Sequence, residues 1–298
     1  MTSQGLKGLL IRTGNVRRPD LGFLLAGDPA KEDEERPHAA IFRWKAGQLT
    51  RVDAQFNANT SCIIEDPEYG VLRASSSGAY SIETRAGVQS NNIFNNSHPT
   101  PKVKRFGDLR SVRAIQGRAY AVGGTGWAFR LDKIAGWTLI DKGLAATANL
   151  ESIDGFAHDD LYIAGYRGDV WHWDGRAWSK CDTPTNVNLN VVRCAADGCV
   201  YAAGRGGFMM RGKGDDWQIV DQPIIEDDIW DLAWFEGALY VSTLAGLFRL
   251  HDGGVAAVNF VGDAPNSCYH LSVAPGVMWS VGARDVMAFD GHRWTRII

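Results

Sequence analysis

The sequence predicts an all-β chain folded as a seven-bladed β-propeller with four antiparallel strands per blade. Three observations predict it. A pattern of about forty residues recurs along the chain, and each copy divides into four short apolar or alternating runs. The 298 residues also include 34 glycines and 11 tryptophans. Glycine favours tight turns and aromatic residues favour strands, so this composition is typical of many short hairpins.

The repeat is clearest at one aromatic position in the second run of each copy. Its residues are Tyr120, Tyr162, Tyr201, Tyr240 and Trp279, with successive spacings of 42, 39, 39 and 39 residues. Chance does not keep that phase over five copies. A unit of about 40–45 residues with four strands indicates a propeller blade.

Two less regular copies precede these five. Residues 71–82 place Gly78 48 residues before Gly126, at the equivalent turn. Residues 22–27 and 40–44 are interpreted as two strands of the first copy, separated by an acidic insertion that we expect to be a solvated loop. The total is therefore seven, while six or eight blades would require another interpretation of the N-terminal half.

Turn chemistry separates the runs within a copy. In the third copy the strands are expected at about 110–115, 118–123, 126–131 and 136–140, with one helical turn over 142–149. Gly-x-x-Gly marks the turn between second and third strands. Asp-Gly marks the turn between third and fourth strands, where both residues are expected to have positive φ. These pairs stand at 174–175, 252–253 and 290–291.

We expect one propeller domain spanning residues 1–298. Residues 6–12 would supply the inner strand of blade 1 and residues 294–298 the outer strand of blade 7, so that the terminal blades pack together. The blades are expected at about 6–54, 60–90, 109–141, 150–181, 189–221, 229–258 and 268–298.

Charge and hydropathy exclude several classes of protein. A net charge of −3 and a pI near 6.2 argue against nucleic-acid binding through a basic field. No apolar run is long enough for a membrane span or a signal peptide, so a cytoplasmic location is expected. The odd set of five cysteines is then expected to be reduced. Cys194 and Cys199 flank a predicted turn, and a disulfide between them is the alternative.

Motifs for catalysis and metal binding are missing from the sequence. It has no HExxH, no GxSxG, no EF-hand loop and no phosphate loop that opens a helix. The seven histidines are scattered over several blades, so no metal site and no cofactor is expected.

The second-to-third-strand turns supply the first set of candidate binding residues. Arg167, Arg205 and Arg284 occupy matching positions and could grip a carboxylate or a phosphate. The alternative is that these turns simply tolerate exposed arginine. The full set from these turns is Tyr166, Arg167, Arg205, Leu244 and Arg284.

The loops between blades supply the second set. Trp230 would suit an interaction hot spot, or else it packs between blades. The connection 86–108 is longer than a blade needs, and is either functional or a mobile spacer. The candidates from the interblade loops are Glu151, Trp230, Asp231, Tyr269 and His270, and those from the long connection are Phe94, Lys102, Lys104 and Arg105.

The phrase Tyr-Ala-Val-Gly-x-x-Gly at 120–126, with Asp-Gly-x-x-Trp hairpins at 174–178 and 290–294, resembles bacterial propellers of the neuraminidase-repeat and photosystem-assembly type. The resemblance covers residues 109–298 best and implies a fold. The hairpins are similar to the sialidase Asp-box, except that His172 and Ala288 replace its Ser or Thr. WD-repeat propellers also have seven blades, but their Gly-His and Trp-Asp dipeptides are missing in register.

Similar propellers occur beside bacterial toxin genes as immunity proteins. The favoured function is therefore a non-catalytic, monomeric, protein-binding propeller that binds and neutralises a toxin. One alternative is an enzyme at the channel mouth, whose three arginines hold an anionic sugar or small acid and whose Glu151, Asp231 or His270 is the acid or base. Another is an assembly factor that docks an acidic partner segment. Fold alone does not decide among them.

Overall fold

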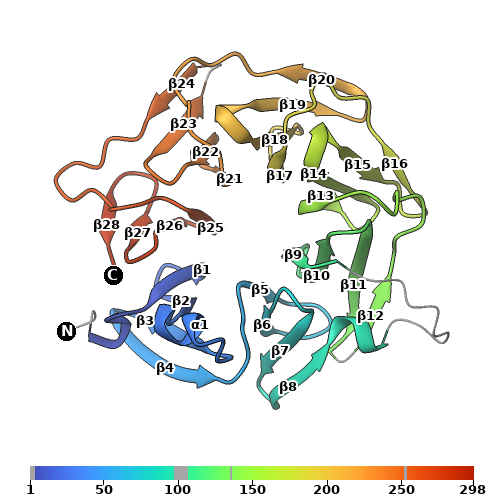
Figure 1. Cartoon of the computed structure of the whole chain (residues 1–298). Helices are drawn as coiled ribbons and strands as arrows, with labels where there is room; N and C mark the ends of the chain where they lie inside the picture. The colour runs from blue at the N-terminus through green and yellow to red at the C-terminus, as the bar shows by residue number, and fades with distance from the viewer. Residues whose placement is uncertain (1–3, 97–106, 135, 252–253) are drawn as a thin grey trace. The chain divides into compact units, whose positions relative to one another are not determined.

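The computed structural model describes residues 4–96, 107–134, 136–251 and 254–298, whose strands form seven four-stranded antiparallel sheets (Figure 1). Each sheet is a meander made by one contiguous segment, in which every strand pairs with the next along the chain. Each sheet is one blade. The predicted fold class, an all-β seven-bladed propeller with four strands per blade, is confirmed.

The described chain divides into two compact units. The terminal unit is Met1–Asn59 with Gln222–Ile298, and the middle unit is Thr60–Asp221. The strands of the terminal unit are β1 (Leu10–Arg18), β2 (Leu21–Gly27), β3 (Ala39–Lys45) and β4 (Gln48–Ala54) in blade 1; β21 (Asp231–Phe235), β22 (Ala238–Ser242), β23 (Leu247–His251) and β24 (Gly254–Ala257) in blade 6; and β25 (His270–Ala274), β26 (Val277–Val281), β27 (Val286–Phe289) and β28 (Trp294–Arg296) in blade 7.

The middle unit contains blades 2 to 5. Its strands are β5 (Thr60–Ile64), β6 (Gly70–Ala74), β7 (Ala79–Thr84) and β8 (Gly87–Asn92); β9 (Leu109–Ile115), β10 (Arg118–Gly123), β11 (Trp127–Lys133) and β12 (Gly136–Leu139); β13 (Leu150–Ala157), β14 (Asp160–Gly165), β15 (Val170–Trp173) and β16 (Trp178–Lys180); and β17 (Leu189–Cys194), β18 (Val200–Gly204), β19 (Met209–Lys213) and β20 (Asp216–Ile219). The short helical segments in the described ranges are α1 (Pro29–Asp33) and the 3-10 turns η1 (Gln4–Leu6), η2 (Ile93–Asn96), η3 (Tyr166–Gly168) and η4 (Arg205–Gly207).

The repeated aromatic position lies in the core of each unit. Its five side chains are all buried, in the second strands of their blades. The outer-strand tryptophans Trp137, Trp178 and Trp217 are buried as well, whereas Trp294 is half-buried with its ring stacked on Phe289 at 4.7 Å. Large aromatic faces are therefore buried in the core, where each contributes packing energy.

The two glycines of Gly-x-x-Gly are required for different reasons. In blade 4, Gly165 has extended backbone, and a Cβ there would lie 2.0 Å from the carbonyl oxygen of Asn149. Gly168 has a left-handed φ of 73°, and its Cβ would lie 2.1 Å from the carbonyl oxygen of Thr185. The motif therefore brings the turn against the two neighbouring loops, and the prediction of turn glycines is confirmed.

The Asp-Gly turns differ in part from the prediction. Gly175 and Gly291 have left-handed φ values of 87° and 94°, but Asp174 does not enter that region. Its carboxylate Oδ1 instead accepts the backbone N–H groups of Arg176 and Ala177 at 2.8 and 2.9 Å. The expectation of two positive φ values was wrong because the side chain, and not a second left-handed residue, satisfies the turn. The pair at 252–253 lies outside the described residues.

Three local expectations were also wrong. The acidic insertion contains the short helix α1, because the Oδ1 atom of Asp28 accepts the N–H of Ala30 and Pro29 stands at the first position. Residues 142–149 form turns without a helical turn. Finally, β8 occupies residues 87–92 of the segment expected to be a loop from residue 86.

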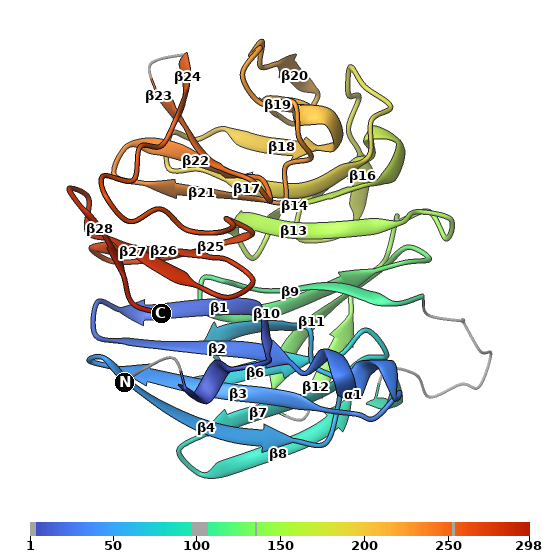
Figure 2. The ribbon, with the colours of Figure 1, turned by 60° about the vertical axis from the view of Figure 1, so that its left-hand side comes forward.

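The first and last blades pack together within the terminal unit, where β1 lies alongside β25 and β26 (Figure 2). The backbone N–H of Val16 donates to Ser272 Oγ at 2.9 Å, and the N–H of Ile11 donates to the carbonyl of Ala283 at 2.8 Å. Trp279 is fully buried here and meets Trp44 edge-on at 5.6 Å. The predicted packing between terminal blades is confirmed, but the expected position of the inner strand at residues 6–12 was wrong. Residues 4–6 form the turn η1, and β1 spans Leu10–Arg18.

Candidate protein-binding face

Two kinds of connection meet at the same edge of each blade. In an antiparallel meander the end of the second strand lies beside the start of the first. Accordingly, the N–H of Tyr166 donates to the carbonyl of Asn149 at 3.0 Å, and the N–H of Trp230 donates to the carbonyl of Ser242 at 2.9 Å. We call the second-to-third-strand turns and the loops entering each first strand the turn face of their unit.

Asn188 accepts hydrogen bonds from two arginine-bearing turns in the middle unit. Its side-chain Oδ1 accepts the N–H of Arg167 at 3.0 Å, and its carbonyl accepts the N–H of Arg205 at 3.1 Å. Both arginine side chains are exposed, and neither has an ion-pair partner among the described residues. Blades 4 and 5 therefore present neighbouring uncompensated positive charges on a braced backbone.

Arg167 occupies an unfavourable backbone conformation. Its φ is 59°, in the left-handed region that L-residues other than glycine seldom adopt. The equivalent residue in blade 5 is Gly206, which also has a φ of 59°. The turn geometry therefore does not require an arginine at this position, because glycine adopts the same backbone conformation in blade 5. Arg205 is the first residue of its turn and is equivalent to Tyr166, so the expectation that Arg167 and Arg205 occupy matching positions was wrong.

Glu151 lies beneath this part of the turn face. Burial raises the pKa of its carboxyl group, while Arg110, whose Nε lies 3.6 Å from Oε1, and a hydrogen bond with the side chain of Tyr166 act in the opposite direction. Tyr166 itself is 37% exposed. The carboxylate therefore interacts with both Tyr166 and Arg110, and Tyr166 remains partly exposed.

The turn face of the terminal unit is aromatic and aliphatic. The rings of Trp230 and Tyr269 lie 5.7 Å apart, and Tyr269 meets His270 at 4.5 Å. Trp230 is half-buried, so it packs against the next blade and also keeps part of its surface exposed. Leu244 is 54% exposed, and Arg284 is exposed without an ion-pair partner within the described residues.

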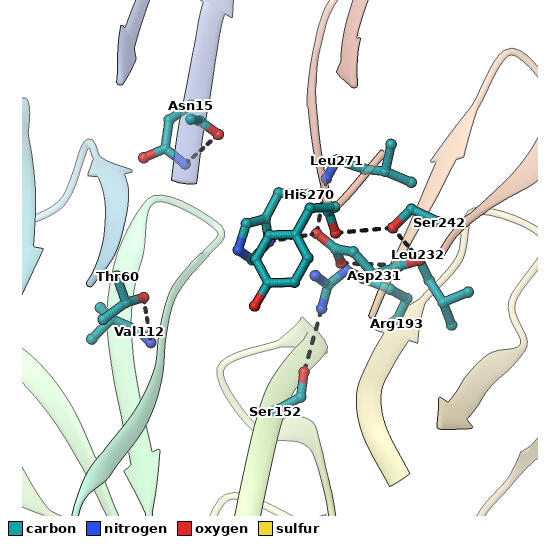
Figure 3. Close-up of polar contacts among 12 residues, drawn as sticks. Asn15, Thr60, Val112, Ser152, Arg193, Asp231, Leu232, Ser242, His270 and Leu271 are labelled. Atoms are coloured by element: carbon teal, nitrogen blue, oxygen red, sulfur yellow. Dashed lines mark hydrogen bonds and ion pairs between the residues drawn. The ribbon is translucent and has the colours of Figure 1, made fainter. Parts of the chain in front are cut away.

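Asp231 attaches one blade to the next (Figure 3). It is 4% exposed, and its Oδ2 accepts the N–H of Leu271 at 3.0 Å and lies 3.4 Å from His270 Nδ1. Its Oδ1 accepts the N–H of Leu232 at 2.8 Å. The carboxylate therefore joins the first strands of blades 6 and 7, which leaves it poorly placed to meet a partner.

Hydroxyl and carboxylate groups make the same attachment in the middle unit. Ser152 Oγ accepts the N–H of Val192 at 3.2 Å. Thr60 Oγ1 accepts the N–H of Val112 at 3.4 Å (Figure 3). Asp154 Oδ2 likewise accepts the N–H of Cys194 at 3.1 Å. Sequence reasoning missed these attachments. These first strands contain several polar residues, as β13 does with Glu151, Ser152 and Asp154, so no local pattern singles out the residues that make the attachments.

Phe94 is a packing residue. Its ring meets Trp127 edge-on at 5.3 Å and lies 6.1 Å from Phe129, in the core formed by blades 2 and 3. The side chain thus stabilises the middle unit from within. The basic residues predicted to follow it, at 102, 104 and 105, lie outside the described residues.

The described residues contain no group of three or more His, Cys, Asp and Glu side chains that could hold a metal ion. The acids named for the enzyme alternative are held by other groups: Asp231 by backbone N–H groups, and Glu151 by Arg110 and Tyr166. The five cysteines are free thiols, including Cys194 and Cys199. None of the helices in the described ranges has the length and apolarity that crossing a membrane requires.

These observations define the class of the protein: a seven-bladed β-propeller whose turn faces present exposed arginine, aromatic and aliphatic side chains. Over 296 residues the chain is 31% identical to the immune protein Tsi7 of Pseudomonas aeruginosa, and the match covers 96% of each chain. The chain therefore belongs to the family of that immune protein. No family model matches the sequence.

Solved structures show the same fold at low sequence identity. YCF48 bound to D1 peptide has a TM-score of 0.67 and 13% identity, with 94% of this chain and 91% of that chain covered. YCF48 from Cyanidioschyzon merolae has a TM-score of 0.68 at 13% identity, with 94% and 95% covered. The WD40 propeller of Doa1 has a TM-score of 0.66 at 10% identity, with 97% and 92% covered. The predicted resemblance to photosystem-assembly-like and WD-repeat-like propellers is confirmed at the level of fold.

Proposed function

We propose that this chain is a cytoplasmic immunity protein that binds a cognate bacterial toxin and neutralises it as a monomer, without chemistry of its own. The observation that carries the proposal is the 31% identity to immune protein Tsi7 over 96% of both chains. A match of this length includes the blades and their connecting loops alike, so it supports a shared role as well as a shared fold.

The turn faces support binding as the mechanism. Arginine, tyrosine and tryptophan are the residue types that most often dominate protein–protein binding energy. Here Tyr166, Arg167 and Arg205 stand on backbone held by Asn149 and Asn188. A braced backbone reduces the conformational entropy that association would otherwise cost. These residues, with Leu244, Trp230, Tyr269, His270 and Arg284 in the terminal unit, form the proposed binding set.

Growth protection tests the proposal directly. A candidate toxin gene from the source genome would be induced in a host cell with the wild-type chain or with the Arg167→Ala/Arg205→Ala/Arg284→Ala variant. We expect the wild type to restore growth and to bind the purified toxin, and the triple variant to bind at least about 100-fold more weakly, because removing a hot-spot side chain costs more than about 1 kcal/mol each.

The matched control replaces three exposed arginines that lie off the turn faces, Arg43, Arg85 and Arg249, by alanine. It should bind and protect like the wild type. A wild-type chain that neither binds the toxin nor protects the host would refute the proposed function. Equal binding by both triple variants would refute the role of the arginines.

A further inference from the structure

The loop that enters blade 6, residues 222–230, carries uncompensated negative charge. From residue 222 to residue 248 the chain has no Lys, Arg or His. Glu226 and Asp227 are exposed, and neither has an ion-pair partner among the described residues. By contrast, exposed Asp53 and Asp263 in the same unit are paired with Arg51 and Arg296 at 2.9 and 2.8 Å.

This acidic loop is braced from within. Gln222 Oε1 accepts the N–H groups of Ile224 and Ile225 at 3.0 and 2.7 Å, and its Nε2 donates to the carbonyl of Ile225 at 3.0 Å. Ile225 and Ile229 are buried on either side of the acidic residues. The carboxylates are therefore presented from a loop anchored at both ends, which lowers the entropy lost on binding.

Exposed aliphatic side chains accompany the charge. Ile224 is 46% exposed in the acidic loop, and Leu244 is 54% exposed in the adjoining turn of the same blade. The hydrogen bond from Trp230 N–H to the Ser242 carbonyl connects the loop to the start of that turn. An aliphatic centre with a charged rim is the usual composition of a protein interface.

We infer that the acidic loop and Leu244 form a docking surface for a basic protein surface, on which lysine or arginine side chains surround an apolar contact. The inference rests on the proposed function and identifies that basic surface as part of the toxin. Glu226 and Asp227 would lose hydration on docking, so association is favourable only where cations replace the water. An acidic partner would be repelled by the same two carboxylates.

The test measures binding of the purified candidate toxin from the growth-protection experiment at low and at high salt. Glu226→Lys is compared with Glu236→Lys, an equal charge reversal in the first-to-second-strand turn of the same blade. Ile224→Ser is compared with Val52→Ser, because the side chain of Val52 is 66% exposed on β4 of the same unit. All four residues are at the surface, so folding is expected to be retained and is checked by circular dichroism.

We expect Glu226→Lys to weaken binding by at least about tenfold at low salt and by less at high salt. Ile224→Ser should weaken binding at both salt concentrations. The two control variants should bind like the wild type. Replacing a toxin Lys or Arg by Glu should restore affinity for Glu226→Lys. If the wild type binds and Glu226→Lys binds equally well, the inference is wrong while the proposed function stands. If the wild type does not bind the toxin at all, the proposed function fails and the inference fails with it.

Discussion

Glycine is favoured in the second-to-third-strand turns for two separate reasons. The backbone is left-handed at some positions, and at others there is also no space for a Cβ atom. In blade 5, Gly206 has a φ of 59°, and a Cβ there would meet nothing within 4 Å. In blade 4, Gly168 has a φ of 73°, and its Cβ would collide with the carbonyl oxygen of Thr185. Arg167, at the position equivalent to Gly206, shows that a side chain is tolerated where space is open.

Replacing each glycine by alanine should separate the two demands. We expect Gly206→Ala to lower the free energy of unfolding by about 1–2 kcal/mol, the cost of left-handed backbone for an L-residue. Gly168→Ala should lower it by at least about 3 kcal/mol, because the backbone of a neighbouring loop must also shift. Urea unfolding measures both. Equal losses would show that steric crowding does not contribute.

The stability of two third-to-fourth-strand hairpins depends on pH through the aspartate in each turn. Donation from the N–H groups of Ala177 and then Arg176 holds the pKa of Asp174 below its usual value of 3.8. Donation from Arg293 and then His292 does the same for the pKa of Asp290. A carboxyl group whose folded pKa is lowered stabilises the folded state fully above its unfolded pKa. That contribution is lost as the pH falls through the folded value.

The double variant Asp174→Asn/Asp290→Asn should therefore be less sensitive to acid than the wild type. Between pH 6 and pH 3 we expect the wild-type urea midpoint to fall further, since the amide of asparagine still accepts hydrogen bonds but does not titrate. Asp216→Asn, at an exposed aspartate, is the control and should follow the wild type. Parallel curves for the double variant and the wild type would contradict this account of the hairpins.

For the molecule as a whole, packing between blade 1 and blade 7 joins the two ends of the chain within the terminal unit. Trp279 lies against Gly22, where a Cβ would come within 2.1 Å of its ring, and Trp44 meets it edge-on. Trp294 belongs to the same blade, but it is half-buried on the outer strand. The two tryptophans therefore differ in what their removal exposes.

Trp279→Ala should lower the free energy of unfolding by about 3–5 kcal/mol, the range for truncating a large buried aromatic residue. Trp294→Ala should lower it by less, because part of that ring is already in contact with water. Urea unfolding of the two variants provides the comparison. A loss at Trp294 as large as that at Trp279 would place the main stabilising contact of blade 7 on its outer strand.

The repeat, the number of blades and the turn glycines could be predicted from the sequence alone. An aromatic residue every 39 to 42 positions and a Gly-x-x-Gly turn are local requirements of one blade, so they can be read wherever they recur. The prediction was weakest where a local rule has two solutions, as at Asp174, where a side chain replaced a left-handed residue. The same holds for α1, where a capping aspartate and a proline began a helix in an acidic insertion.

Which polar residues hold the blades together, and which remain exposed, could not be predicted before the folded structure was known. Asp231 and Glu226 are both acidic residues near the start of blade 6, yet one is buried against the backbone of blade 7 and the other is exposed. Phe94 resembled a surface aromatic but packs against Trp127. These outcomes depend on contacts between segments far apart in the chain, and a local pattern contains no information about where such segments meet.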